Sequence, residues 1–186
     1  MRIEIDEETV EELKKIFEGV EGRAKLLFFR DTEGECEYCD DLERILEIVA
    51  SLHEGLEFVS LTSDSEEAEK YGIGMFPAIL VHGREEHNVR FFGAPLGYEF
   101  AVLVEDILDA LRGGPRLDRD VAEKIEKIEE RVWIKVFVTP SCPYCPIASR
   151  TAHKFAMLNK NIVADVIDAT EFAELAEKYR VFAVPK

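Results

Sequence analysis

The sequence predicts an α/β fold of two tandem units, each a mixed sheet with helices on both faces. The first observation behind this prediction is that apolar segments of strand and helix length alternate along the chain. The second is a set of markers that recurs at an almost constant offset. A Cys-x-Tyr-Cys motif recurs after 106 positions, and an Ala-Glu-Lys-Tyr segment and a proline recur after 108: 36–39 and 142–145, 68–71 and 176–179, Pro77 and Pro185.

The first predicted unit covers residues 1–113. A short strand from Ile3 to Ile5 is expected before a helix over 10–20, for which Asp6 is the candidate cap. The apolar segment over 25–30 predicts a buried strand that leads into a helix starting at the cysteines. The other expected elements are a strand over 56–61, a helix over 65–71, strands over 78–81 and 89–92, and a closing helix over 100–111.

The second predicted unit covers residues 114–186 and follows a linker rich in glycine and proline at 112–116. Asp118 is the candidate cap of its first helix. The inner face of that helix is expected to consist of Val121, Ile125 and Ile128. The elements expected after it are a strand over 132–138, a helix over 145–158, a strand over 162–167 and a helix over 170–179.

The repeat also predicts how the second unit ends. About 34 residues that follow Pro77 in the first unit have no counterpart after Pro185. They contain the predicted strand pair and the closing helix. We therefore expect the second unit to be truncated after its proline, with one sheet edge unpaired and one sheet face uncovered.

Composition narrows the classes of function. The formal net charge of −16 should repel phosphate backbones, so we expect no nucleic-acid partner. The chain contains no run of 18 apolar residues, so we expect no membrane-spanning helix. Its acidic start lacks the apolar core of a signal peptide, which favours a cytoplasmic protein. The chain contains no glutamine and 33% charged residues, a composition typical of hyperthermophiles, some of which keep many intracellular disulfides.

The paired cysteines carry the candidate chemistry. Two intervening residues let both sulfurs meet across one helical turn at the start of a helix. The unpaired N–H groups and the dipole there stabilise a thiolate on the first cysteine, Cys36 or Cys142. The second cysteine, Cys39 or Cys145, is expected to be more buried and to resolve the mixed disulfide.

Other uses of the cysteines remain open. Two such pairs can form a four-cysteine zinc site, and each pair can also be an inert structural disulfide. The pairs are about a hundred residues apart, and each follows its own predicted strand, which favours two redox sites.

Each motif has a proline about forty residues downstream. Pro77 follows Phe76, and Pro185 follows Val184. An ordinary strand-entry proline is one interpretation. The matched spacing favours a cis-proline loop that faces the cysteines and leaves the backbone of the preceding residue free to pair with a substrate strand.

At these motifs the chain resembles the thioredoxin superfamily, and more closely the glutaredoxin-like protein disulfide oxidoreductases of hyperthermophiles, which join two thioredoxin folds. The most specific segment is Cys-Pro-Tyr-Cys at 142–145. The resemblance implies two thioredoxin-like units that reduce and oxidise protein disulfides and can isomerise them. It implies nucleophilic Cys36 and Cys142, resolving Cys39 and Cys145, and cis-prolines at Pro77 and Pro185.

The same resemblance implies no cofactor beyond the redox-active disulfides. The expected partners are protein disulfide and dithiol substrates and a flavoprotein like thioredoxin reductase. Tyr38 and Tyr144, within the motifs, are further candidate substrate contacts. Thioredoxins place a buried acid six residues before the first cysteine, but Arg30 and Val136 occupy those positions, so no proton acceptor is identified.

Two other functions remain as alternatives. One is a dedicated electron shuttle between a flavoprotein reductase and a peroxidase-type client. The other is a binding module in which the cysteines hold zinc or form structural disulfides. The two motifs are also expected to differ: acids crowd Cys36, whereas residues 139–144 contain none, so Cys142 is expected to have the lower thiol pKa and the more oxidising disulfide. The acids near Cys36 are Glu33, Glu35, Glu37, Asp40 and Asp41.

Overall fold

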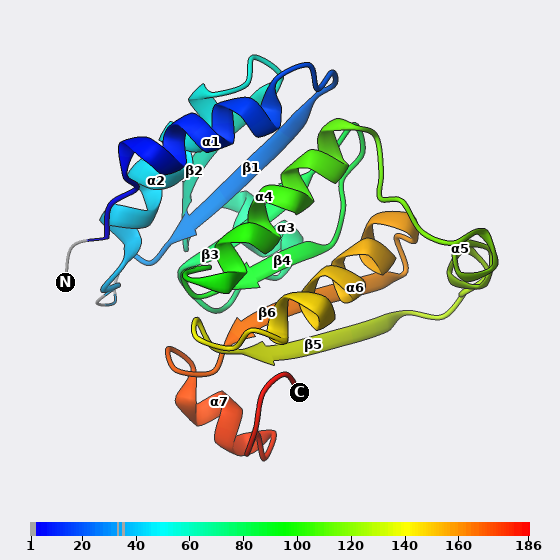
Figure 1. Cartoon of the computed structure of the whole chain (residues 1–186). Coiled ribbons are helices and arrows are strands. Elements are labelled where there is room, and N and C mark those ends of the chain that lie inside the picture. Colours follow the sequence, from blue (N-terminus) through cyan, green and yellow to red (C-terminus); the bar gives the residue numbers. More distant parts are fainter. Residues whose placement is uncertain (1–2, 33, 35) are drawn as a thin grey trace.

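A computed structural model of the chain describes residues 3–32, 34 and 36–186. Its elements are α1 (Glu7–Phe17), β1 (Ala24–Arg30), α2 (Cys39–Ser51), β2 (Leu56–Thr62), α3 (Glu66–Tyr71), β3 (Ala78–His82), β4 (Val89–Phe92), α4 (Tyr98–Leu111), α5 (Arg119–Glu126), β5 (Val132–Val138), α6 (Cys145–Leu158), β6 (Ile162–Asp168) and α7 (Ala173–Lys178). The strands form one sheet of six in the order β2-β1-β3-β4-β6-β5. In Figure 1, α1, α2, α4 and α6 lie on the near face of this sheet and α3 lies behind it. The predicted mixed α/β fold is confirmed.

The sheet buries both of its faces because its strands alternate apolar side chains between two layers. Leu26 and Phe28 of β1 belong to the core on the face of α2 and α4. Leu27 and Phe29 belong to a smaller core on the opposite face. This period-two alternation is what a strand covered on both sides requires.

The first unit matches its predicted elements except at the N-terminus. The Asp6 carboxylate caps α1 by accepting the Thr9 N–H, as predicted. The predicted strand from Ile3 to Ile5 is wrong, because these residues have no strand partner. The Ile3 N–H instead donates to the Asp41 carboxylate at 2.7 Å, so a side chain takes the place of a sheet neighbour.

The second unit departs from prediction in two helices. Asp118 stands at the N-cap position of α5, but its side chain makes no capping hydrogen bond, and the predicted inner face of this helix is only half-buried. α7 starts later than predicted, because the Asp168 carboxylate accepts the N–H groups of Thr170 and Glu171 and holds a turn there. Figure 1 shows α5 at the far end of the sheet, near the C-terminal end of α6, whose C-cap Asn159 donates to the Ile125 C=O.

The two units share one sheet, so the expectation of a separate sheet for each is wrong. β4 pairs in parallel with β6, from Val89 opposite Ala164 to Phe92 opposite Ile167. This pairing gives hydrogen-bond partners to two strands that would otherwise each present an open edge.

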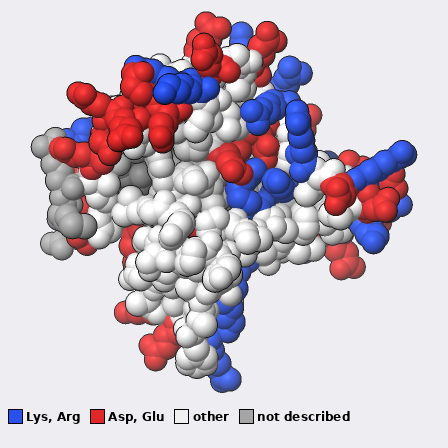
Figure 2. Space-filling model, in the orientation of Figure 1, with Lys and Arg blue, Asp and Glu red and all other residues white. Residues whose placement is uncertain are grey.

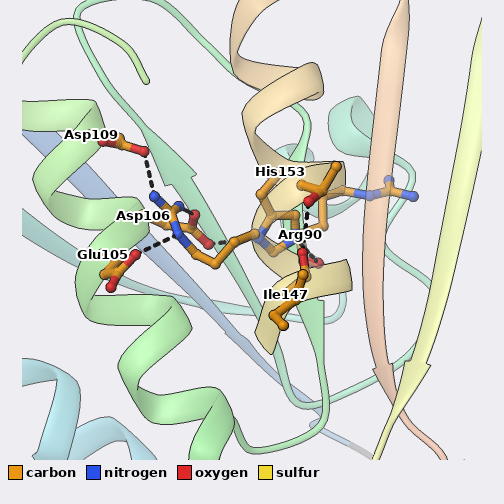
Figure 3. Close-up of polar contacts among 8 residues, drawn as sticks. Arg90, Glu105, Asp106, Asp109, Ile147 and His153 are labelled. Carbon is orange, nitrogen blue, oxygen red and sulfur yellow. Dashed lines mark hydrogen bonds and ion pairs between the residues drawn. The ribbon is translucent and has the colours of Figure 1, made fainter. Parts of the chain in front are cut away.

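Buried polar groups join the units on both faces of the shared sheet. On one face, Arg90 of β4 forms an ion pair at 2.6 Å with Asp165 of β6, and both side chains are almost fully buried. On the other face, Asp106 of α4 contacts Nδ1 of His153 of α6 at 2.6 Å. Figure 3 shows the acids of α4, Glu105, Asp106 and Asp109, directed at α6, where Arg150 pairs with all three.

Candidate active site

Both cysteine pairs lie at the same end of the sheet, where β1 and β5 reach their C-terminal residues. β1 runs antiparallel to β3 and β3 antiparallel to β4, whereas β4, β6 and β5 are mutually parallel. β1 and β5 therefore point in the same direction, and the motifs that follow them emerge together. Four strand spacings of about 4.8 Å separate β1 from β5, which places the sites roughly 19 Å apart. At that distance the four cysteines do not share a zinc ion.

Each pair forms a disulfide at the start of a helix. Cys36 is bonded to Cys39 and Cys142 to Cys145, with Cα atoms 5.4 and 5.5 Å apart. The second cysteine is the first residue of α2 or α6, and the motif tyrosine stands at the N-cap position. The spacing of the motif thus closes the bond within the turn that enters the helix.

Burial distinguishes the two sulfurs of each pair. Cys39 and Cys145 are 1% and 0% exposed, whereas Cys36 is half-buried and Cys142 is 8% exposed. In each motif the first cysteine is therefore the more exposed of the two. The backbone N–H of Cys145 donates to Sγ of Cys142 at 3.1 Å, so a helix N-terminal donor already points at the sulfur that would become a thiolate.

The two prolines lie at the same end of the sheet as the disulfides. The peptide bonds Phe76–Pro77 and Val184–Pro185 are cis, as predicted. Pro77 precedes Ala78, which pairs with Phe29 near the end of β1. Pro185 precedes Lys186, whose backbone N–H and C=O both bond to Phe137 near the end of β5. Phe137 and Lys186 lie 108 positions after Phe29 and Ala78, so the two halves repeat this pairing residue for residue.

A buried carboxyl group near the second disulfide was missed by the sequence prediction. Glu99, in the first turn of α4, is 2% exposed. It lines a small cavity with Pro140 and Asp168, and the neighbouring Tyr98 N–H donates to the Pro140 C=O in the loop that leads to Cys142. The first unit therefore supplies a buried acid beside the redox loop of the second.

The surroundings of Glu99 keep its carboxyl group protonated more readily than usual. Burial raises the pKa of Glu99, an effect partly offset by the Ser149 hydroxyl and by His153 and reinforced by the Asp106 and Asp168 carboxylates. Ser149 is completely buried on α6, one helical turn after Cys145. Neither side chain has a well-aligned hydrogen-bond partner in the described part of the chain. The available signal was that Glu99 falls on the apolar face of a helix, where an acid is unusual.

The first site has a different electrostatic environment. Arg30, which stands where thioredoxins carry an acid, bonds to Asp40 at 2.8 Å and Glu43 at 2.9 Å on α2. Two of the acids on which the lower pKa of Cys142 was predicted, Glu33 and Glu35, lie outside the described residues.

Carboxylates of the second unit reach the first motif. Glu171, after β6, accepts the Ala94 N–H at 2.7 Å, and burial raises its pKa, with a contribution from Glu37. The Glu37 carboxylate in turn raises the pKa of Tyr38, with smaller contributions from burial and Glu171. A buried carboxyl group of each unit thus lies within electrostatic range of groups at or near the redox motif of the other.

Comparisons with known proteins agree with this architecture. A family model described as a thioredoxin domain matches residues 132–186. A protein disulfide oxidoreductase from Aeropyrum pernix is 26% identical, with a TM-score of 0.88 over 98% of this chain and 83% of that chain. The family model and this structural match both support the resemblance to the thioredoxin superfamily. The recognised family resemblance is confirmed at this level.

Other proteins similar to this chain are components of reductases. The alkylhydroperoxide reductase component AhpF of Enterococcus faecalis is 25% identical, with a TM-score of 0.87 over 97% of this chain and 88% of that chain. The corresponding alkyl hydroperoxide reductase component of Staphylococcus aureus (strain NCTC 8325 / PS 47) is 33% identical over 101 residues, which are 54% of this chain and 20% of that protein. The chain spans 20% to 28% of the length of the curated relatives it matches.

Two further findings concern all the residues that the structure describes. Among its described residues, no helix has both the length and the apolar character needed to cross a membrane. Within the same residues, no three or more histidine, cysteine, aspartate or glutamate side chains are grouped so that they could hold a metal ion.

Proposed function

We propose that the chain is a protein thiol–disulfide oxidoreductase that reduces, oxidises and isomerises disulfides of protein clients at both sites. The observation that carries this proposal is the arrangement shared by the two sites. In each, a disulfide joins a more exposed first cysteine to an almost fully buried second cysteine at a helix start, and a cis-proline lies at the same end of the strands. The match to the A. pernix enzyme over nearly the whole chain supports it.

The reductive half-reaction balances with these groups alone. The Cys142 thiolate attacks one sulfur of a client disulfide, and the other client sulfur leaves as a thiolate and takes up a proton. The Cys145 thiol then loses its proton and attacks Sγ of Cys142, which releases the second client thiolate. The client gains two electrons, and the Cys142–Cys145 disulfide stores the oxidising equivalent. Cys36 and Cys39 take the same roles at the first site.

The remaining site residues have positioning roles in this proposal. The backbone of Phe76 and Val184, each before a cis-proline, pairs with an extended client segment, and Tyr38 and Tyr144 contact it beside the disulfide. Glu99 accepts the proton of Cys145 when the mixed disulfide resolves. Its burial and its proximity to Ser149, which lies one helical turn after Cys145 on α6, support this role.

Trapping the mixed disulfide tests the assigned order of the cysteines. In a Cys36→Ser, Cys39→Ser background, a Cys145→Ser variant should accumulate a covalent adduct with insulin or another disulfide client, because attack survives and resolution does not. A Cys142→Ser variant should form little adduct. Intact-mass measurement distinguishes these results, and equal trapping by both variants would refute the assignment.

A second candidate function is a dedicated electron shuttle between a thioredoxin-reductase-like flavoprotein and a peroxidase-type client. The matches to alkyl hydroperoxide reductase components of two bacteria favour it. A shuttle should reduce one peroxidase rapidly and insulin slowly, whereas a general oxidoreductase should do the reverse. Rapid-mixing kinetics with both clients separates the two functions.

The proposal also includes the cellular location of the protein and the kind of organism it comes from. The charge and the composition of the sequence support a cytoplasmic enzyme of a hyperthermophile, with no nucleic-acid or membrane partner. A thermal unfolding midpoint above about 90 °C would support the hyperthermophile origin. A midpoint between about 45 and 65 °C would contradict it.

A further inference from the structure

The most exposed apolar side chains of the molecule gather at one redox site. Among the described residues, the three large apolar side chains with the greatest exposure are Phe182 at 92%, Tyr144 at 71% and Ile147 at 70%. All three belong to the two segments that form the second site, the cysteine motif and the loop before the cis-proline. Tyr144 and Ile147 lie on either side of Cys145, and Phe182 lies three residues before Pro185.

The corresponding positions of the first site lack this apolar surface. Tyr38, in place of Tyr144, is half-buried, and Gly74 stands in place of Phe182. The position of Ile147 is taken by Asp41, which forms an ion pair with Arg44 and accepts the Ile3 N–H. The two sites therefore share their cysteines and prolines but present different surfaces to a client.

The exposure of Phe182 follows from the backbone at that position. An atom added as Cβ to Gly74, its counterpart, would meet no heavy atom within 4 Å. In the first unit, where β3, β4 and α4 all follow the proline, a side chain at this position would thus project into open space. The same backbone position in the second unit directs a phenyl ring into solvent from the loop before the cis-proline.

Charge separates the two surfaces further. Residues 139–147 contain no charged side chain, whereas residues 31–41 contain six acids. Figure 2 shows acidic side chains massed over α1 and α2, and a mainly uncharged area where Figure 1 places the start of α6 and the front of α7. Beside the second disulfide, Phe182 and Val184 line a groove of about 830 Å³ that extends to Thr139, directly before the redox loop.

We propose that Tyr144, Ile147 and Phe182 form an apolar docking surface that selects, for the second site, extended apolar segments of a protein client. This inference rests on the proposed function, because exchange at Cys142 brings a client cysteine to its Sγ and the flanking client residues onto these three side chains. An aromatic ring and an aliphatic side chain that are solvated in the free protein lose water on contact with apolar residues and gain little from charged ones. The first site lacks two of the three and does not share this preference.

The internal repeat supplies matched variants for a test. In a Cys36→Ser, Cys39→Ser background, only the second site works. Two disulfide peptides with the same loop are compared, one flanked by leucine and valine and the other by serine and asparagine. Phe182→Gly and Ile147→Asp install the residues of the first site. Ile16→Ser, on α1, removes an exposed apolar side chain far from the disulfide.

The Cys36→Ser, Cys39→Ser parent should have a kcat/KM about tenfold or more higher for the apolar peptide than for the polar one. Adding Phe182→Gly and Ile147→Asp together should reduce this ratio of kcat/KM values to near one. Ile16→Ser should leave the ratio unchanged. In the reciprocal Cys142→Ser, Cys145→Ser background, Gly74→Phe should raise the ratio at the first site.

An unchanged ratio in the double variant would overturn the docking surface, as would a parent that shows no preference. Reduction of bis(2-hydroxyethyl) disulfide, which has no flanking residues, is measured alongside. A parent that reduces neither peptide nor this small disulfide would instead refute the proposed function itself.

Discussion

The backbone N–H of Cys145 donates a hydrogen bond to Sγ of Cys142 at 3.1 Å. This N–H belongs to the first turn of α6, and it also donates to the Cys142 C=O at the longer distance of 3.4 Å. The donor and the helix dipole both favour negative charge on the sulfur. No acidic side chain occurs between Thr139 and Ile147 to oppose it. At the first motif, Glu37 and Asp40 are exposed close to Cys36, although Asp40 is engaged by Arg30.

Cys142 should therefore have a lower thiol pKa than Cys36. Carboxylates near a thiolate raise its pKa, and an N–H donor lowers it. Iodoacetamide alkylation is measured against pH on two variants, one with Cys36 and Cys39 replaced by serine and the other with Cys142 and Cys145 replaced. The half-maximal rate should fall at lower pH for Cys142, and loss of Cys142 should cost more activity than loss of Cys36. Equal midpoints, or a lower one for Cys36, would contradict the prediction.

Replacement of Glu99 by glutamine should slow turnover at the second site. General-base catalysis typically contributes 10²–10⁴-fold, so we expect a loss of at least about tenfold in kcat near neutral pH in the Cys36→Ser, Cys39→Ser background. The parent rate should rise with pH through the raised pKa of Glu99, because only the carboxylate accepts a proton, and the variant should lack this rise. Glu171→Gln is the control: that acid is also buried with a raised pKa but lies by the first site. A Glu99→Gln variant with the parent pH profile would exclude Glu99 as the proton acceptor.

The same substitution should stabilise the fold at neutral pH. A carboxyl group whose pKa is raised by folding imposes no penalty below its unfolded pKa, where both states are protonated. Its penalty grows as the pH rises from the unfolded pKa to the folded pKa, because only the unfolded state has lost its proton there, and is complete above the folded pKa, where the folded state buries the charge. Urea unfolding should accordingly show Glu99→Gln more stable than the parent at pH 8, with the difference shrinking towards pH 4. A variant that is less stable at pH 8 would mean that the Glu99 carboxylate makes favourable contacts.

Removal of the Asp165 charge should weaken the junction between the units. Asp165 is 1% exposed and accepts hydrogen bonds from Arg90, Trp133 and Lys135 at 2.7, 2.6 and 2.9 Å. Asp165→Asn leaves the buried guanidinium without a counter-charge, and breaking such a pair typically costs about 3–5 kcal/mol. Glu123→Gln removes the exposed ion pair with Arg119 and should cost less than about 1 kcal/mol. Similar midpoint shifts for the two variants in urea would contradict this account.

How much of this structure was predictable depends on how local its determinants are. The helix that starts at Cys145 was predicted with its observed bounds because its spacing and its strand–helix boundary are local signals. The pairing of β4 with β6 was not, because no sequence signal links Val89 to Ala164, and only the three-dimensional fold shows that their open edges meet. Glu99 was missed for the same reason: it acts beside a redox loop that follows it by some forty residues and belongs to the other repeat.

The site residues likewise divide into those that the sequence identified and those that it did not. The sequence identified the cysteines and the cis-prolines because their spacing is repeated, and their catalytic and client-binding roles remain predictions. The exposure that separates Phe182 from Gly74 depends on the direction of the backbone in the folded loop, which composition does not report.

His82 should make the fold sensitive to mild acid. It is 5% exposed at the end of β3, and its Nδ1 accepts the His87 N–H at 3.0 Å. Burial lowers the pKa of His82 from 6.5 to about 4. Below pH 6.5 the unfolded chain binds a proton that the folded chain binds only near pH 4, so this stability is present above pH 6.5 and is lost as the pH falls towards 4. Between pH 7.5 and 5 the loss from this residue should be about 2 kcal/mol.

In His82→Asn, Oδ1 can accept the same N–H without titrating, so the variant should lose less stability over this interval in urea unfolding. Parallel pH dependence of the two proteins would show that His82 is protonated in the folded state as readily as in the unfolded chain.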